Sequence, residues 1–200
     1  MKEQFKAFRF LVSALAISAA LSLVCFAQQT SGNQGNRVQA PKEISADKVA
    51  ALVAEWTRAK DYTREYLDAM PEDGIGFKPS ADIRSFGNQM VHLAGGFYFM
   101  TKPIFGIDAP YDPRKMEEMP ELKKDKAALT KTVMDSYDLV IAQIKKLDAA
   151  KLDESITLFG IKMPRHIAIA KAFEHQTHHR GQTTIYLRLK GVKPPPEKLF

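Results

Sequence analysis

Histidines are the residues of this chain whose types and spacing best suit chemistry. Three of the five histidines fall in one short stretch, HQTHH, as His175, His178 and His179. Each residue of an α-helix turns about 100°, so His175 and His179 differ by ~40° and lie one turn apart on the same face. Two imidazoles at that spacing can meet one metal ion. The pattern therefore predicts that His175 and His179 are metal ligands.

The neighbours of this pair supply further candidates. Gln182 and Tyr186 continue the same helix face, and we expect them to contact a substrate or to support the ligands. Arg180 is expected to be a surface or ion-pairing group, or to bind an anionic substrate near the metal. His178 lies about 100° from His179 and should point elsewhere. The pair His175 and His178, three residues apart, remains a geometric alternative.

A third ligand has to come from elsewhere, because catalytic zinc sites take three protein ligands and leave one position open. His92 is the best candidate, since it lies in the middle of another helical stretch and a bundle can bring two helices together in its core. His166 is weaker, because it lies nine residues before His175 on roughly the opposite face. The competing interpretation is that HQTHH is a solvated polar face and that His92 is a hydrogen-bonded core or surface histidine.

The chemistry of such a site follows from its neutral ligands. Three imidazoles leave the charge of the ion uncompensated, so the pKa of a bound water falls toward ~7 in favourable zinc sites. That water can attack an ester or amide; alternatively, the ion can hold a thiolate or polarise a carbonyl. No carboxylate on the ligand face is an evident general base, and Glu174 is expected to be solvated. Imidazole suits several metals, so the sequence does not select one.

Four helical stretches must position these side chains. Apolar residues recur every three or four positions from residue 45 to 70, from 85 to 100 or beyond, from 122 to 147 and from 164 to 190. The segment between the last two, residues 152–163, is rich in β-forming residues, with a turn expected at Gly160. This pattern predicts an all-α fold, an antiparallel four-helix bundle.

The N-terminus is predicted to be a signal peptide, residues 1–27. A basic start is followed by an apolar run at residues 10–24, shorter than the ~20 residues that span a bilayer, and by small residues before Gln28. An uncleaved membrane anchor is the alternative. Residues 28–43 are polar and are expected to be a flexible linker. The bundle domain then occupies residues 44–200, and the protein would be periplasmic or secreted.

Composition excludes several classes of protein. Of 200 residues, 45% are hydrophobic and 26% charged, which is typical of a globular chain and rules out full disorder or a polytopic membrane protein. The single cysteine, Cys25, rules out a disulfide framework. The net charge of +6 is modest and scattered, without a basic block interleaved with aromatics, so no nucleic-acid partner is expected.

Two stretches resemble the DinB-like family, also called the DinB/YfiT-like metalloenzymes. One is MPEDGIGFKPSADIRSFGNQMVHL, residues 70–93, and the other is HQTHHRGQTTIYLRLKGVK, residues 175–193, with its HxxxHRGQ core. The resemblance covers about residues 44–196. It implies a four-helix bundle that holds a divalent metal, zinc or nickel with manganese as a further option. Carried over by motif, the ligands are His92, His175 and His179.

The resemblance leaves the activity open. Some members of the family are thiol-dependent transferases or isomerases, but an export signal argues against that chemistry, since low-molecular-weight thiols are scarce outside the cytoplasm. We therefore expect an exported metal-dependent hydrolase or transferase acting on an unidentified small molecule. The alternative is a noncatalytic metal- or ligand-binding bundle, and a third interpretation is a domain that only packs or forms a homodimer. No membrane partner is expected once the signal is removed.

Overall fold

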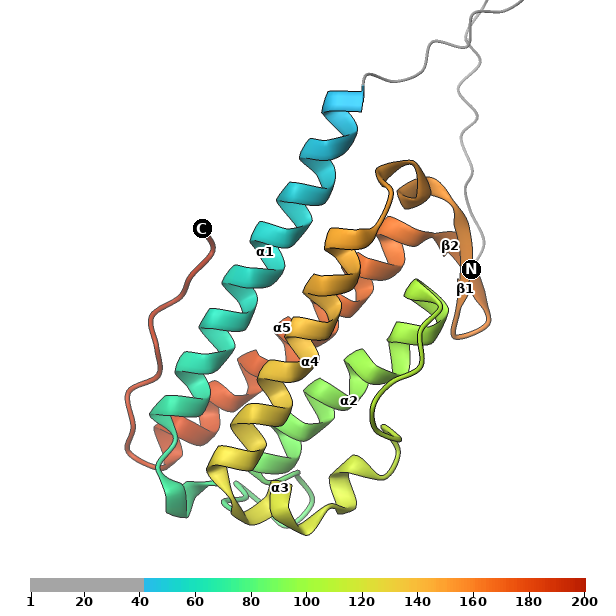
Figure 1. The fold of residues 1–200 in the computed structure, drawn as a ribbon. Coiled ribbons are helices and arrows are strands. Elements are labelled where there is room, and N and C mark those ends of the chain that lie inside the picture. Colours follow the sequence, from blue (N-terminus) through green and yellow to red (C-terminus); the bar gives the residue numbers. More distant parts are fainter. Residues whose placement is uncertain (1–41) are drawn as a thin grey trace, which may run out of the picture. The chain divides into compact units, whose positions relative to one another are not determined.

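The structure is a computed structural model that describes the backbone of residues 42–200 and the side chains from residue 48. The predicted signal peptide and nearly all of the predicted linker therefore lie outside the described residues. Four long helices build the bundle (Figure 1): α1 (Lys42–Ala69), α2 (Phe86–Phe105), α4 (Lys126–Lys146) and α5 (Arg165–Leu189). Short elements connect them: α3 (Pro120–Lys124) and the 3-10 turns at 72–74, 116–118 and 149–153. Within the described residues, no helix is both long and apolar enough to cross a membrane.

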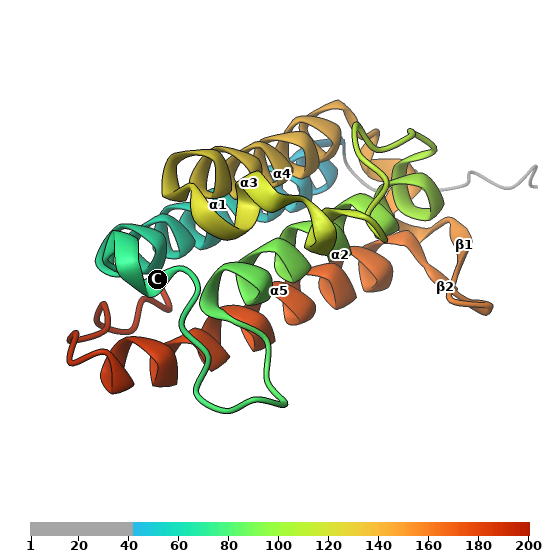
Figure 2. The ribbon, with the colours of Figure 1, turned by 90° about the horizontal axis from the view of Figure 1, so that it is seen from below.

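The helices pack around a square in the order α1, α4, α2, α5, so that α1 lies diagonally across from α2 (Figure 2). One aromatic side chain from each helix meets in the core. The Trp56 ring of α1 lies 5.1 Å from Phe97 of α2, 6.2 Å from Tyr137 of α4 and 5.5 Å from Phe173 of α5, each edge to face. Such buried aromatic contacts contribute strongly to the packing free energy of a core.

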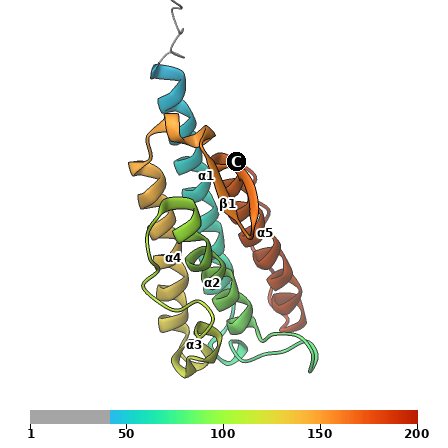
Figure 3. The same cartoon turned by 90° about the vertical axis from the view of Figure 1, so that its right-hand side faces the viewer.

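The prediction that the bundle is antiparallel throughout is wrong for two pairs of neighbours. Lys126 at the start of α4 donates to the carbonyl of Met70 just after α1, so these two helices are antiparallel. The start of α2 lies near the same end, because Gly87 approaches the carbonyl of Leu122. Hence α2 and α4 run in the same direction, as do α1 and α5 (Figure 3). The reason is the connection over residues 106–125, which returns along the length of α2 before α4 begins.

The expected helix over residues 122–147 is also interrupted. Asp125 has an extended backbone, and its carboxylate accepts hydrogen bonds from the amides of Ala127 at 2.8 Å and Ala128 at 3.1 Å. This is an N-cap, which begins a new helix and ends α3. A serine just before a helical stretch favours an N-cap, and Ser85 at the start of α2 accepts from the amide of Asn88 at 3.2 Å.

The β-rich segment forms a hairpin, so the protein is mostly helical rather than strictly all-α. Strand β1 (Ser155–Leu158) pairs antiparallel with β2 (Ile161–Pro164), and Leu158 lies opposite Ile161. The turn between them has two residues, Phe159 at φ 52° and Gly160 at φ 80°. Both are left-handed, as the tight turns that suit a twisted hairpin require.

Candidate metal centre

Helices α2 and α5 bring His92, His175 and His179 together. The ring centroid of His92 lies 5.5 Å from that of His175 and 4.5 Å from that of His179. The rings of His175 and His179 are 4.4 Å apart. One nitrogen from each side chain falls within 4.8 Å of the others, close enough to share one ion. The antiparallel pairing of α2 and α5 thus joins residues that lie more than eighty positions apart in the sequence.

Gly96 makes room for His175. It lies one turn after His92 on α2, and a Cβ at this position would stand only 2.1 Å from Nε2 of His175. The same nitrogen is buried and has no hydrogen-bond partner among the described residues. A buried polar atom without a partner costs free energy, which a bound cation or ligand can offset.

A carboxylate orients His92. Oε1 of Glu117 lies 2.8 Å from Nδ1 of His92, and Oε2 accepts from Nε of Arg84 at 3.0 Å. Burial alone would raise the pKa of Glu117, but hydrogen bonds from Arg84 and His92 and the positive charge of Arg84 lower it. The ionised carboxylate can only accept, so Nδ1 of His92 carries the hydrogen and Nε2 keeps its lone pair for a metal.

The side-chain amides of Gln89 and Gln182 lie next to Nδ1 of His179. Oε1 of Gln182 lies 3.2 Å from Nδ1 of His179, and Nε2 of Gln89 lies 2.8 Å from the same nitrogen. Gln89 also hydrogen-bonds directly to Gln182. The amide nitrogen of Gln89 can only donate, so Nδ1 of His179 either accepts from Gln89 or donates to the carbonyl oxygen of Gln182. In the tautomer that donates to Gln182, the other ring nitrogen is free as a ligand atom.

The environment of His175 and His179 disfavours their protonated forms. The pKa of His179 is lowered to about 3, chiefly by burial and then by the neighbouring imidazoles of His175 and His92. The pKa of His175 is also lowered, chiefly by burial and then by His92. Metal ions bind neutral imidazole, so this environment suits a ligand set.

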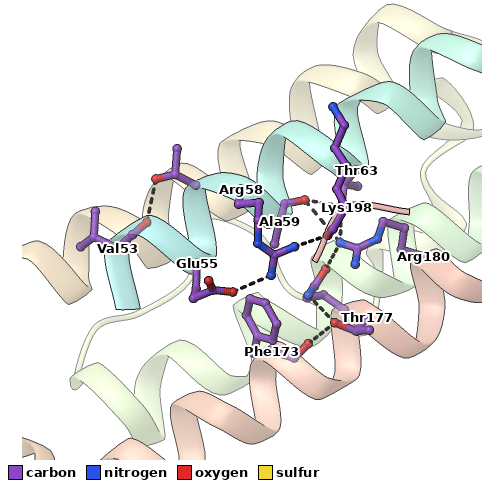
Figure 4. A network of polar contacts seen from close by, with 11 residues as sticks. Val53, Glu55, Arg58, Ala59, Thr63, Phe173, Thr177, Arg180 and Lys198 are labelled. Carbon is purple, nitrogen blue, oxygen red and sulfur yellow. Dashed lines mark hydrogen bonds and ion pairs between the residues drawn. The ribbon is translucent and has the colours of Figure 1, made fainter. Parts of the chain in front are cut away.

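The other two candidate residues lie away from the histidines. Tyr186 is buried, and its hydroxyl donates to the backbone carbonyl of Arg84 at 2.8 Å. Arg180 is buried on the face of α5 that meets α1 (Figure 4). Its Nη1 donates to Oε1 of Gln176 at 2.7 Å, and the guanidinium lies 4.4 Å from the Tyr62 ring centre. The guanidinium of Arg180 is therefore not at the surface, and it points toward α1 rather than toward the histidine cluster.

The two remaining histidines do not join the cluster. His178 is exposed, and although its ring lies 4.9 Å from that of His179, it is not part of the group that converges. His166 lies in the first turn of α5, with Nδ1 3.0 Å from the carbonyl oxygen of Leu152. Of the alternatives left open by spacing alone, the structure favours the pair at i and i+4.

Comparison with known proteins agrees with this architecture. The DinB family model matches residues 45–199, which is most of the chain. The chain belongs to the DinB family. The uncharacterized protein YjoA of Bacillus subtilis (strain 168) is 25% identical over 143 residues, which cover 70% of this chain and 89% of YjoA.

Solved DinB-like structures share the fold. One from Bacillus cereus ATCC 10987 superposes with a TM-score of 0.61 at 20% identity, covering 74% of this chain and 95% of that one. YjoA from Bacillus subtilis superposes with a TM-score of 0.57 at 24% identity, covering 74% and 96%.

A cavity of about 690 Å³ opens beside the histidines of this DinB-family chain. It lies between α2, α5, the hairpin and the connection after α2. Its walls are mainly apolar, and His92, His175 and His178 line it together with four charged residues. The lining residues include Phe99, Met100, Leu158, Phe159, Ile161 and Met163.

Two supporting residues escaped prediction from the sequence. Glu117 belongs to a 3-10 turn in a long connection, where no periodic pattern indicates which helix it contacts. Gln89 is buried on α2, three residues before His92. An amide at that spacing from a candidate ligand is a signal that could have found Gln89.

Proposed function

We propose that this DinB-family protein binds a divalent metal ion through His92, His175 and His179. The observation that supports the proposal best is the convergence of three imidazoles from two helices, with ligand atoms within 4.8 Å of one another. The buried Nε2 of His175 adds support, because it has no hydrogen-bond partner among the described residues and a bound metal ion would give it a partner. The family resemblance favours zinc or nickel, with manganese as a further option, among the several metals that imidazole suits.

We further propose that the site acts on a small molecule, as an exported hydrolase or transferase. A divalent ion held by three neutral ligands supplies Lewis acidity toward water or toward an oxygen or sulfur of the substrate. The chain's own residues prepare the site: Glu117 and Gln182 fix the rings of His92 and His179. The adjoining cavity gives a substrate access to the histidines, which favours a working site over a closed structural one.

A noncatalytic metal- or ligand-binding role is the alternative. It would be favoured if the loaded protein bound small molecules at the cavity but left them unchanged. Export is supported by the pattern of residues 1–27 alone. Mass analysis of protein recovered from the producing cell's periplasm or medium tests it: we expect an N-terminus near Gln28, and an intact Met1 on cytoplasmic protein would refute export.

Metal content of purified protein tests the proposed ligands. Wild-type protein should retain about one zinc or nickel ion per chain after dialysis, whereas His179→Ala should retain far less. His178→Ala is the matched control, because His178 is the adjacent histidine but is exposed and outside the cluster. Equal metal content in the two variants would reject the ligand assignment.

A further inference from the structure

The hairpin turn places a large apolar side chain where the backbone does not favour it. Phe159 has φ 52° and is followed by Gly160 at φ 80°, in a two-residue turn between Leu158 and Ile161. Turns of this kind prefer Asn or Asp followed by Gly, because these residues tolerate the left-handed region. A bulky residue there is strained. The side chain of Phe159 must be explained by something other than turn formation.

Core packing does not explain Phe159 either, because 66% of the residue is exposed. Its ring stacks on that of Phe99 of α2, with centroids 5.6 Å apart and planes 12° from parallel. Phe99 is itself 43% exposed, and Ile161 in the adjacent position of β2 is 63% exposed. All three line the cavity beside the histidines. Strained residues of this kind concentrate at sites that bind ligands.

We propose that the stacked pair Phe99 and Phe159 forms the apolar wall of a substrate pocket, and that the substrate has an aromatic or branched aliphatic body. This inference rests on the proposed function, in which the reacting end of the substrate reaches the histidines. The apolar body of the substrate then lies against Phe99, Phe159 and Ile161. Met100, Leu158 and Met163 continue this apolar lining.

The charged residues that line the cavity are consistent with a substrate whose body is apolar. Glu117 is engaged by Arg84 and His92, and Lys171 pairs with Glu174 at 2.7 Å. Three of the four charged residues of the lining are thus paired within the protein, and the fourth, Arg114, has no ion-pair partner among the described residues. The cavity of about 690 Å³ is within the size range of pockets for small organic ligands.

Phe159→Asn separates a ligand-binding role from a structural one. Asn adopts the left-handed conformation more readily than Phe, so the variant should keep or raise the thermal unfolding midpoint. It also removes apolar surface from the pocket, so the uncharged fluorescent probe N-phenyl-1-naphthylamine should bind about tenfold more weakly. Ile185→Ser is the matched control: it removes an apolar side chain that is 55% exposed on α5 and outside the cavity, and probe affinity should not change.

The titration uses the full chain, so any probe bound by the apolar run at residues 10–24 is common to all variants. Equal probe affinity in wild type and Phe159→Asn would overturn the proposal. So would sedimentation showing a wild-type dimer that Phe159→Asn dissociates, because the patch would then be an interface. His179→Ala should still bind the probe, which makes the two proposals separable. Equal metal content in His179→Ala and His178→Ala rejects only the metal site, and an unaltered probe affinity in Phe159→Asn rejects only the substrate class.

Discussion

Gly96 lies against the imidazole of His175, so closely that a Cβ on Gly96 would be 2.1 Å from Nε2. No side-chain atom other than hydrogen fits between the α2 backbone and this ring. The absence of a side chain at Gly96 therefore determines where a histidine of α5 can stand. Gly95, its neighbour, differs: a Cβ there would meet its nearest atom, the carbonyl oxygen of Pro113, at an ordinary 3.5 Å.

The first prediction compares Gly96→Ala with Gly95→Ala. Gly96→Ala should displace His175 and weaken zinc binding by about tenfold or more, because one of three ligands moves. Gly95→Ala should leave zinc binding unchanged and favour the helix by up to ~1 kcal/mol. Competition against a chromogenic zinc chelator measures the affinities. The same affinity in both variants would contradict the proposed role of His175.

The second prediction concerns the carboxylate that orients His92. Glu117→Gln preserves shape but removes the charge that Nδ1 of His92 faces at 2.8 Å. Loss of such outer partners lowers metal affinity by about 10- to 100-fold, and the lower end is expected here because an amide oxygen can still accept. Glu118→Gln is the control, since Glu118 is exposed in the same turn. If both variants bind zinc like the wild type, Glu117 does not position the ligand.

These residues also show what the sequence could predict. The pair His175 and His179 follows from helical spacing, and the N-cap at Ser85 follows from local hydrogen bonding. Both depend only on a few residues that are close in the sequence, so the sequence pattern is enough to predict them. His92 could be named as a candidate because it lies in the middle of a second helix of the predicted bundle and matches the histidine of the family motif.

Glu117 and the direction of α4 could not be predicted in this way. Both depend on how residues 106–125 return along α2, a path determined by tertiary contacts rather than periodicity. The break at Asp125 was missed because the apolar period continues on both sides of it. Arg180 was misplaced because a charged residue on a helix is usually solvated, whereas here neutral acceptors on α1 and α5 surround it.

The third prediction follows from the position of Arg180. Arg180→Leu should lower the free energy of unfolding by about 2 kcal/mol, because a buried hydrogen bond to a charged donor is lost. Zinc binding should not change, since the guanidinium faces α1. Urea unfolding and the chelator assay measure the two effects. Arg188→Leu, at an exposed position of α5, should alter stability by no more than about 0.5 kcal/mol. Loss of zinc from folded Arg180→Leu would instead restore Arg180 as a site residue.

The fourth prediction concerns the acid stability of the metal-free protein. The pKa of His179 is lowered to about 3 in the folded chain, mainly by burial, whereas an unfolded chain takes up this proton near pH ~6.5. As the pH falls below ~6.5, the unfolded state therefore binds a proton that the folded state does not, and folding loses up to about 1.4 kcal/mol per pH unit until the folded pKa is reached. Urea unfolding of chelator-treated protein between pH 7.5 and 5 should show this slope. His179→Asn should show a shallower slope, because it cannot take up that proton; equal slopes would mean that His179 is not held neutral by the fold.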